Sequence, residues 1–367
     1  MRTTNRARRV AGAVLGALTL VALSACAGQS SPAGPASGSS AASGLISADR
    51  CAKNKAAGSI TFLTSYAYAA STGILDPVVA AQRGYFKDLC LDVRIQPGST
   101  NAQLVSAGKA QLAGLGSASD VMTAASAGAK ITGIATYGNT PAITLMSLAD
   151  SGITSLKDFS GKTLGYKDAI PPQIQSMLET AGVTGVKWVS VGYDPIILAQ
   201  KKVDGLTAYI SNEPHALAVK GVKVTQWDPG SYGIKSTFNT QIVNTEWGKA
   251  NPTAVEDFLR ASLHAYQWIN ASSANLDTAI GYAATLSTAG YDKPGSVFRW
   301  KTEVALIAKS QPSGTALGQQ SVAQWTPEAQ ALVKYKILKT APTVANDLTT
   351  TYIDAIYRDG TLVWPAG

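Results

Sequence analysis

The chain has 367 residues, 46% hydrophobic and 15% charged, with a formal net charge of +8. Four basic residues lie within residues 2–9, so a chain without that segment carries only +4, and no run of Lys and Arg interleaved with aromatic residues follows. This pattern gives little support to nucleic-acid binding. A metal site is also disfavoured, because the chain has only two histidines and neither lies near a cysteine.

The first 25 residues predict an export signal. A basic head precedes an apolar run from Val10 to Leu23, which is shorter than the about 20 residues that a membrane-spanning helix needs. The next residues, LSAC, resemble a bacterial lipobox, which implies a signal peptide over residues 1–25 and lipidation of Cys26. The protein would then be exported and lipid-anchored to the outer face of the bacterial cytoplasmic membrane. A plain secretory signal with an incidental cysteine is the alternative, and Arg8 and Arg9 leave twin-arginine export open.

Residues 26–45 predict a flexible tether. Ala27–Gly44 contains no charge and no large apolar residue, so this segment cannot bury a core. As a random coil it would span roughly 25 Å. Such a tether would hold a globular body away from a membrane.

Strand-like and helical segments alternate behind the tether. Residues 74–85 have helical spacing with a left-handed stop expected at Gly84, and residues 91–95 alternate with the period of a strand. This order continues to about residue 244, and the segment after Glu246 is mainly helical, with helices expected over 252–269, 326–338 and 346–358. A βαβα order predicts a mostly parallel sheet wrapped by helices. The 342 residues from Cys26 onward fit two α/β lobes better than one.

Two cysteines remain once Cys26 is assigned to lipidation. Cys51 precedes a predicted strand at 59–66, and Cys90 precedes the strand at 91–95. Adjacent parallel strands would bring their starting ends to one edge, and disulfides persist in exported proteins. We therefore predict a Cys51–Cys90 disulfide; two separate buried thiols are the alternative.

Three motifs resemble one family of solute-binding proteins. The stretch from Val78 to Gly128, with RGYFKDLCLDV and GKAQLAGLGSASDV, is similar to the opening of the thiamine-precursor, alkanesulfonate and nitrate binding family of ABC importers. ITSLKDFSGKTLGY resembles the start of the family's second lobe, and KKVDGLTAYISNEPHALAVKG resembles a later motif. The similarity runs from about Ser59 to about Trp268. The family usually has glycine at the position of Cys90.

The resemblance implies a type II periplasmic-binding-protein fold, in which two α/β lobes joined by two crossovers enclose a ligand cleft. Lobe 1 is expected over residues 46–140 and 244–367, and lobe 2 over residues 141–243. The implied partners are a small-molecule ligand and an ABC permease with its ATPase, and the implied chain is a monomer without a cofactor.

Ligands of open parallel sheets bind beyond the carboxyl ends of the strands, where helix N-termini offer free N–H groups. The residues that we place at these ends are Ser65, Tyr66, Ser117, Asp120, Tyr137, Asn139, Tyr166, Tyr193, Glu213 and Tyr232. So many tyrosines favour a flat or partly apolar ligand, although a single such tyrosine more often packs at a rim. Asp120 could simply cap its helix. Glu213 could accept hydrogen bonds from an amino group of the ligand or only complement the helix dipole.

These observations predict the substrate-binding lipoprotein of an ABC importer, without catalysis. An aminopyrimidine thiamine precursor is the favoured ligand, and an alkanesulfonate or related oxyanion is the alternative. Pyrimidine-synthesising relatives of the family use a cysteine-rich iron motif and pyridoxal phosphate, whereas this chain has no cysteine cluster and its two histidines, His215 and His264, are dispersed. A surface-anchored structural protein would explain the lipid and the tether but not a cleft.

Overall fold

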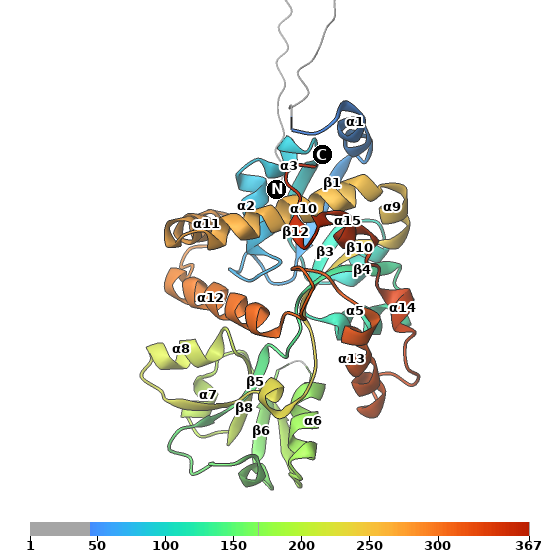
Figure 1. Cartoon of the computed structure of the whole chain (residues 1–367). Coiled ribbons are helices and arrows are strands. Elements are labelled where there is room, and N and C mark those ends of the chain that lie inside the picture. The colour runs from blue at the N-terminus through green and yellow to red at the C-terminus, as the bar shows by residue number, and fades with distance from the viewer. Residues whose placement is uncertain (1–44, 168, 367) are drawn as a thin grey trace, which may run out of the picture. The chain divides into compact units, whose positions relative to one another are not determined.

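A first five-stranded sheet combines four strands from residues 59–138 with one strand, at residues 238–244, that returns from the second sheet. The computed structural model describes residues 45–167 and 169–366, so the predicted signal peptide, Cys26 and nearly all of the tether lie outside the described residues. The strand order is β2-β1-β3-β10-β4 (Figure 1). The strands are β1 (Ser59–Thr64), β2 (Asp92–Pro97), β3 (Leu112–Leu115), β4 (Ile131–Gly138) and β10 (Phe238–Asn244). β1 is parallel to β2 and β3, whereas β10 is antiparallel to β3 and β4.

The helices of this first lobe follow the predicted order. They are α1 (Ala48–Ala56), α2 (Leu75–Gln82), α3 (Tyr85–Asp88), α4 (Asn101–Ser106) and α5 (Ala118–Ser126). The predicted stop after α2 is confirmed, because Gly84 has a φ of 81° and ends the helix in the left-handed region.

A second five-stranded sheet has the order β7-β6-β8-β5-β9. Its strands are β5 (Ile143–Leu148), β6 (Thr163–Tyr166), β7 (Lys187–Ser190), β8 (Gly205–Tyr209) and β9 (Val224–Trp227). The helices are α6 (Pro172–Thr180), α7 (Ile196–Ala199) and α8 (Glu213–Val219), with the 3₁₀ turns η1 (Leu156–Phe159) and η2 (Pro229–Tyr232). β6 runs parallel to β7 and β8, and β5 runs antiparallel to β8 and β9.

Two crossovers join the sheets, as predicted, but the second one lies earlier than expected. Residues 139–142 lead from β4 to β5, and residues 233–237 lead from η2 to β10. The predicted boundary between residues 243 and 244 falls inside β10, which pairs with β3 and β4 of the first sheet. The first lobe therefore resumes at Phe238 rather than at residue 244.

The last third of the chain is mainly helical, as expected. Its elements are α9 (Thr245–Ala250), α10 (Pro252–Asn270), α11 (Ser273–Leu286), α12 (Lys293–Ser310), α13 (Val322–Lys334), α14 (Val344–Asp347), α15 (Thr351–Ala355), β11 (Tyr357–Arg358) and β12 (Thr361–Leu362). α10 packs on α2 and places Phe258 against Phe62 and Phe86 in the core. The predicted helix over 346–358 is wrong, because Leu348 bridges to Gly133 of β4 and separates α14 from α15.

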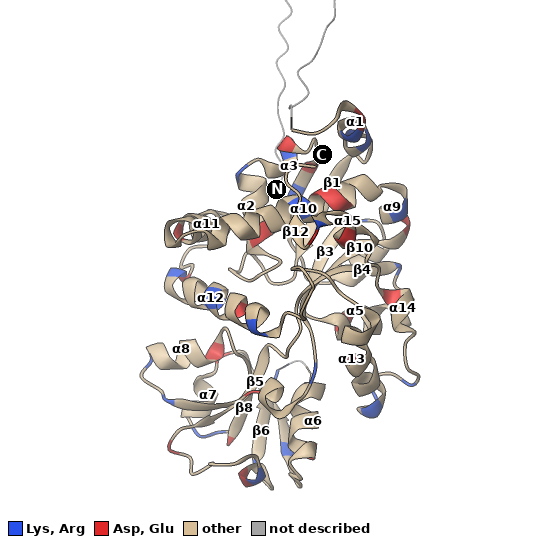
Figure 2. Cartoon of the chain, viewed as in Figure 1, with Lys and Arg blue, Asp and Glu red and all other residues tan. Residues whose placement is uncertain are grey.

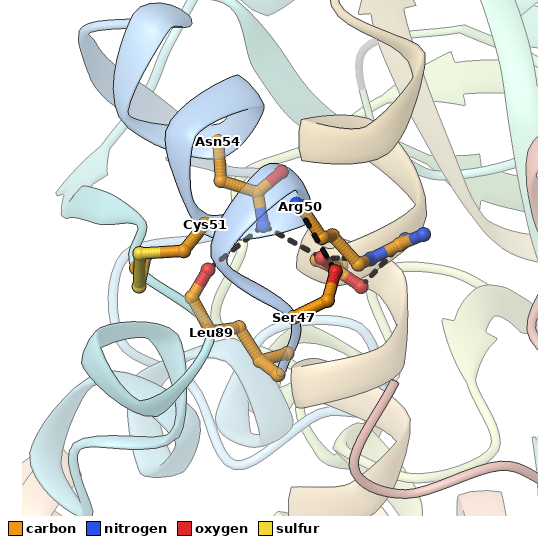
Figure 3. The surroundings of a disulfide bond; sticks show 7 residues. Ser47, Arg50, Cys51, Asn54 and Leu89 are labelled. Carbon is orange, nitrogen blue, oxygen red and sulfur yellow. Dashed lines mark hydrogen bonds and ion pairs between the residues drawn. A yellow bond between two sulfur atoms is a disulfide. The ribbon is translucent and has the colours of Figure 1, made fainter. Parts of the chain in front are cut away.

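The predicted disulfide is confirmed. Cys51 of α1 is bonded to Cys90, which follows α3, and their Cα atoms are 5.3 Å apart. The parallel pairing of Ser59 with Asp92 brings the two strand starts to one edge, as the prediction required. Hydrogen bonds also hold α1 against its neighbours. Arg50 donates to Asp257 of α10 at 2.7 Å, and Asn54 donates to the carbonyl of Leu89 at 2.8 Å (Figure 3).

Candidate ligand-binding site

A cavity among the described residues, called the larger cavity below, has a volume of about 390 Å³, within the usual range of small-molecule sites. Three parts of the chain line it: the segment after β1 with the end of β2, the turn from β8 into α8, and the segment from the end of α11 into α12. The lining includes Tyr66, Tyr68, Ser211, Asn212, His215, Tyr291, Asp292 and Arg299. Both lobes therefore contribute to one cavity.

Tyrosine rings supply much of the cavity wall. Tyr66 is 67% exposed. The hydroxyls of the other two rings are directed to backbone carbonyls, since Tyr68 donates to Ile95 at 3.3 Å and Tyr291 donates to Tyr68 at 3.0 Å. These two rings thus offer the cavity mainly apolar surface.

Arg299 and His215 are two of the polar residues of the wall. Arg299 of α12 donates from Nη2 to Oδ1 of Asn212 in the second lobe. The ring of His215 stacks on Phe298 with centroids 4.4 Å apart, and its buried Nε2 has no hydrogen-bond partner among the described residues. Figure 2 shows both basic and acidic residues along α12.

The carboxylate of Glu303, which lies one helical turn after Arg299 in α12, contacts the loop that precedes α2. Its Oε2 accepts hydrogen bonds from the N–H of Thr72 at 2.8 Å and from the hydroxyl of Ser71 at 2.7 Å. Its Oε1 accepts from the hydroxyl of Ser211 in the second lobe at 3.0 Å. Burial raises the pKa of this carboxyl, and these donors oppose that rise. α12 therefore contacts both lobes through Arg299 and Glu303.

Glu328 of α13 occupies the start of α5 in the same manner. Its carboxylate accepts from the N–H of Ser119 at 3.0 Å and from the N–H of Thr237 at 2.6 Å. It also lines a smaller cavity of about 260 Å³ with Lys235 and Gln173. Glutamates of the chain itself thus accept hydrogen bonds from N–H groups ahead of α2 and in the first turn of α5, and helix starts of this kind are where the sequence predicts the ligand.

Of the ten predicted ligand-binding residues, Tyr66 lies in the lining of the larger cavity, next to the half-buried Ser65. Ser117 and Asp120 lie together in a capping box at the start of α5, where Oδ2 of Asp120 accepts from the N–H of Ser117 at 3.0 Å. Tyr137 needs a correction. Its side chain is 1% exposed and its hydroxyl donates to Asp76, so it lies in the core and not at the cleft.

The other five predicted residues are not part of the lining of either cavity. Asn139 is on the first crossover, and its side-chain amide is buried without a partner among the described residues. Tyr166 packs edge-on against Trp188, and Tyr193 and Tyr232 are exposed in the second lobe. Glu213 is buried at the start of α8, where its carboxylate forms an ion pair with Lys167 and accepts from the N–H of Tyr209 at 2.7 Å. These partners already use the acceptors that we had assigned to a ligand's amino group.

Sequence reasoning missed His215, Tyr291, Arg299, Glu303 and Glu328 as residues of this region. His215 was noted only as a dispersed histidine. The other four lie in the helical last third, where helical spacing predicted helices but gave no signal of which faces return to the cleft. A Glu at the helical spacing of large apolar residues is the signal that could have found Glu303, between Trp300 and Ile307, and Glu328, between Trp325 and Leu332.

Residues 71–274 match the family model described as NMT1/THI5 like, which is more than half of the chain. The chain belongs to the NMT1/THI5-like family. No curated protein sequence matches it significantly.

Solved structures share the fold of this NMT1/THI5-like chain. The aliphatic sulphonate binding protein SsuA from Escherichia coli has a TM-score of 0.60 at 12% identity, covering 80% of this chain and 92% of its own. The alkanesulfonate-binding protein SsuA from Xanthomonas axonopodis pv. citri, bound to MOPS, has a TM-score of 0.58 at 15% identity, with 80% and 98% covered. A mutant of DSZB, in complex with biphenyl-2-sulfinic acid, has a TM-score of 0.57 at 12% identity, with 81% and 97% covered. The two-lobe fold of periplasmic binding proteins is therefore established for this chain.

Among the described residues, no group of three or more His, Cys, Asp or Glu side chains is placed to hold a metal ion. The helices within residues 45–167 and 169–366 include none that is long and apolar enough to cross a membrane.

Proposed function

We propose that this NMT1/THI5-like chain is the substrate-binding component of an ABC importer, which captures a small organic nutrient and delivers it to a permease. The observation that carries the proposal is the cavity of about 390 Å³ lined by residues of both lobes. A ligand that contacts both lobes favours the arrangement in which they are close together, and a permease can read that arrangement. The family and the fold agree with this role.

The lining of the cavity favours a ligand that carries a ring. Tyr66, Tyr68 and Tyr291 offer aromatic surface, which suits the predicted aminopyrimidine and also other flat molecules. Glu213 no longer supports the aminopyrimidine in particular, because Lys167 neutralises its carboxylate. The sulfonate alternative is supported by the sulfonate ligands named for the two SsuA proteins of similar fold.

Export and lipid anchoring are part of the proposal. They rest on the LSAC segment that ends at Cys26 and on the tether behind it. A lipid on Cys26 would keep the binding domain at the outer face of the membrane, close to its permease.

Thermal shift and calorimetry on the mature chain, residues 26–367, test the proposal. The panel contains pyrimidines, aryl and alkyl sulfonates, carboxylates, amino acids and flavins. A true ligand at 100 times its dissociation constant should stabilise the protein by about 2.7 kcal/mol. Chromatography should recover it unchanged, whereas turnover would favour an enzyme of the kind that DSZB represents.

Two exposed tyrosines provide the matched variants. Tyr66→Ala should weaken binding by about five- to 30-fold, the value of one aromatic contact of about 1–2 kcal/mol. Tyr193, which is 65% exposed outside the cavity lining, should tolerate the same change without loss of affinity. The opposite pattern would mean that the ligand binds at the predicted strand ends of the second lobe instead.

A further inference from the structure

We infer that Arg299 is the anion-binding residue of the larger cavity and that the ligand is a ring-bearing organic anion, such as an aryl carboxylate or sulfonate. The inference rests on the proposed binding function and names its substrate class. Among the described residues, Arg299 is the only Lys or Arg that lines this cavity. Its guanidinium has five N–H donors in a fork that matches a carboxylate or sulfonate, and Asn212 accepts from one of its nitrogens.

The charge of Arg299 is not neutralised by a close ion pair. None of the ion pairs within 4.0 Å among the described residues includes it. Glu303 lies one helical turn away and interacts electrostatically with Arg299, but its carboxylate oxygens accept hydrogen bonds from Ser71, Thr72 and Ser211. The guanidinium in the cavity wall therefore has no carboxylate in direct contact, and a ligand anion can take that place.

Asp292 is the acidic residue of the same wall, and its position limits its repulsion of a bound anion. Its carboxylate caps α12 by accepting from the N–H of Gly295 at 3.0 Å, and its residue is exposed. Seven residues of helix separate it from Arg299, about 10 Å along the axis. A ligand bound at Arg299 thus lies far enough from Asp292 for solvent to weaken the repulsion.

Two other places for an anion are already occupied in this structure. Glu303 accepts from the turn before α2, and Glu328 accepts from the first turn of α5. A carboxylate or sulfonate would have to displace a buried glutamate at either place. The smaller cavity offers Lys235, but Glu328 lies in the same lining and opposes an anion there.

The ring has a place beside this anion site. Tyr66, Tyr68 and Tyr291 share the lining with Arg299, and the hydroxyls of the last two are bound to carbonyls. A flat ring between them would exclude water from the ion pair and strengthen it. A small inorganic anion would gain nothing from these rings, so this wall favours an anion that carries a ring.

Calorimetry with matched probes tests the inference on the mature chain. The probes are benzenesulfonate with its neutral partner benzenesulfonamide, and benzoate with benzamide. Arg299→Gln should weaken both anions by about 10- to 150-fold, the range for a lost charge-assisted pair, and leave the amides unchanged. Arg299→Lys should retain part of the affinity, because an ammonium keeps the charge without the fork.

Lys301→Gln and Lys235→Gln are the controls. Lys301→Gln removes an exposed positive charge from α12 outside the lining of both cavities, so anion affinity should persist. Lys235→Gln removes the basic residue of the smaller cavity and should have no effect. Melting curves of all variants without probe establish that each one folds.

Several results would overturn the inference. An equal loss in Lys301→Gln and Arg299→Gln would mean that the overall positive charge of α12, and not the guanidinium in the cavity, favours the anion. A loss in Lys235→Gln would move the anion to the smaller cavity. If a neutral ring compound binds tightest and Arg299→Gln leaves it unaffected, the proposed function stands and this inference falls. If no compound in the whole panel binds, both fall.

Discussion

Cys90 combines a covalent crosslink with an unfavourable backbone angle. Its φ is 59°, in the left-handed region that costs a residue with a Cβ about 1–2 kcal/mol. The disulfide with Cys51 spans 39 residues of sequence and should stabilise the fold by about 3–4 kcal/mol in the chain-entropy model. The crosslink therefore outweighs the strain. The same angle gives a physical reason for the glycine that the family usually has at this position.

A pair of double variants separates the two effects. Cys51→Ala with Cys90→Ala loses the crosslink and keeps the strain, whereas Cys51→Ala with Cys90→Gly loses both. Urea unfolding should show each less stable than the oxidised parent, with the glycine variant about 1 kcal/mol more stable than the alanine variant. An alanine variant of equal or greater stability would contradict the strain at Cys90.

Single residues were predictable where one short-range rule decides them. The Cys51–Cys90 pair followed from the export signal and the two strand starts, and the capping role of Asp120 was one of the two predicted readings. Glu213 shows the limit. Its place before Pro214 indicated a helix start, but only the fold brings Lys167 to its carboxylate across 46 residues.

The start of α2 is an element with two buried carboxyl groups. Asp76 accepts from the N–H of Gly73 at 2.6 Å and from the hydroxyl of Tyr137, while Glu303 accepts from Thr72. Burial raises the pKa of Asp76 to about 7, and the charge of Glu303 contributes to the rise. The N-terminus of a helix stabilises carboxylates. The start of α2 can therefore hold Asp76 and Glu303, although burial by itself disfavours both.

The raised pKa of Asp76 makes stability depend on pH. The folded protein holds the proton up to about pH 7, whereas the unfolded chain releases it near 3.8. The folded state thus binds more protons between these values, and this group's contribution must fall as pH rises from about 4 to 7. Asp76→Asn removes the titration and should flatten that part of the curve.

Urea unfolding at pH 5.0, 6.0 and 7.0 measures this slope. A single group can change the free energy of unfolding by at most about 1.4 kcal/mol per pH unit. The slope of stability against pH should therefore be steeper in the parent than in the Asn variant by a fraction of that value. Asp347, whose pKa burial raises to about 6, supplies the control, because Asp347→Asn should change the slope near pH 5 and leave it near pH 7 unchanged. Identical slopes in the parent and in Asp76→Asn would contradict the raised pKa.

Most elements could be predicted because their signals are local. The spacing of residues 252–269 predicted α10 almost to the residue. Pairing over long distances could not be predicted in this way. The sequence of β10 predicts a strand by itself. Its place between β3 and β4, however, depends on partners that lie 100 or more positions earlier in the chain.

At the scale of the whole molecule, the C-terminal helices α12 and α13 contact both lobes. α12 reaches Ser211 and Asn212 of the second lobe, and Lys334 at the end of α13 pairs with Glu179 of α6 at 2.7 Å. The last of these pairs is exposed and contributes little to stability. The two-lobed fold was predictable from element order and from the family resemblance. The residues that join the lobes across the cleft were not, because Glu303 contacts Ser211 across 92 residues and Arg299 contacts Asn212 across 87.

The proposed lipid anchor would hold the whole chain at a membrane, and two cysteines allow that role to be separated from folding. Cys26→Ala should release the exported protein from the membrane fraction and leave its melting temperature unchanged, because residues 27–44 contain no charge and no large apolar side chain that could stabilise the domain. Cys51→Ala should do the reverse: it removes the disulfide, so melting should occur at a lower temperature while the protein stays with the membrane. Membrane fractionation and melting curves on both variants measure the two effects side by side. If Cys26→Ala protein still sediments with membranes, the LSAC segment is not a lipidation site, and the binding domain must reach its permease from solution or by another anchor.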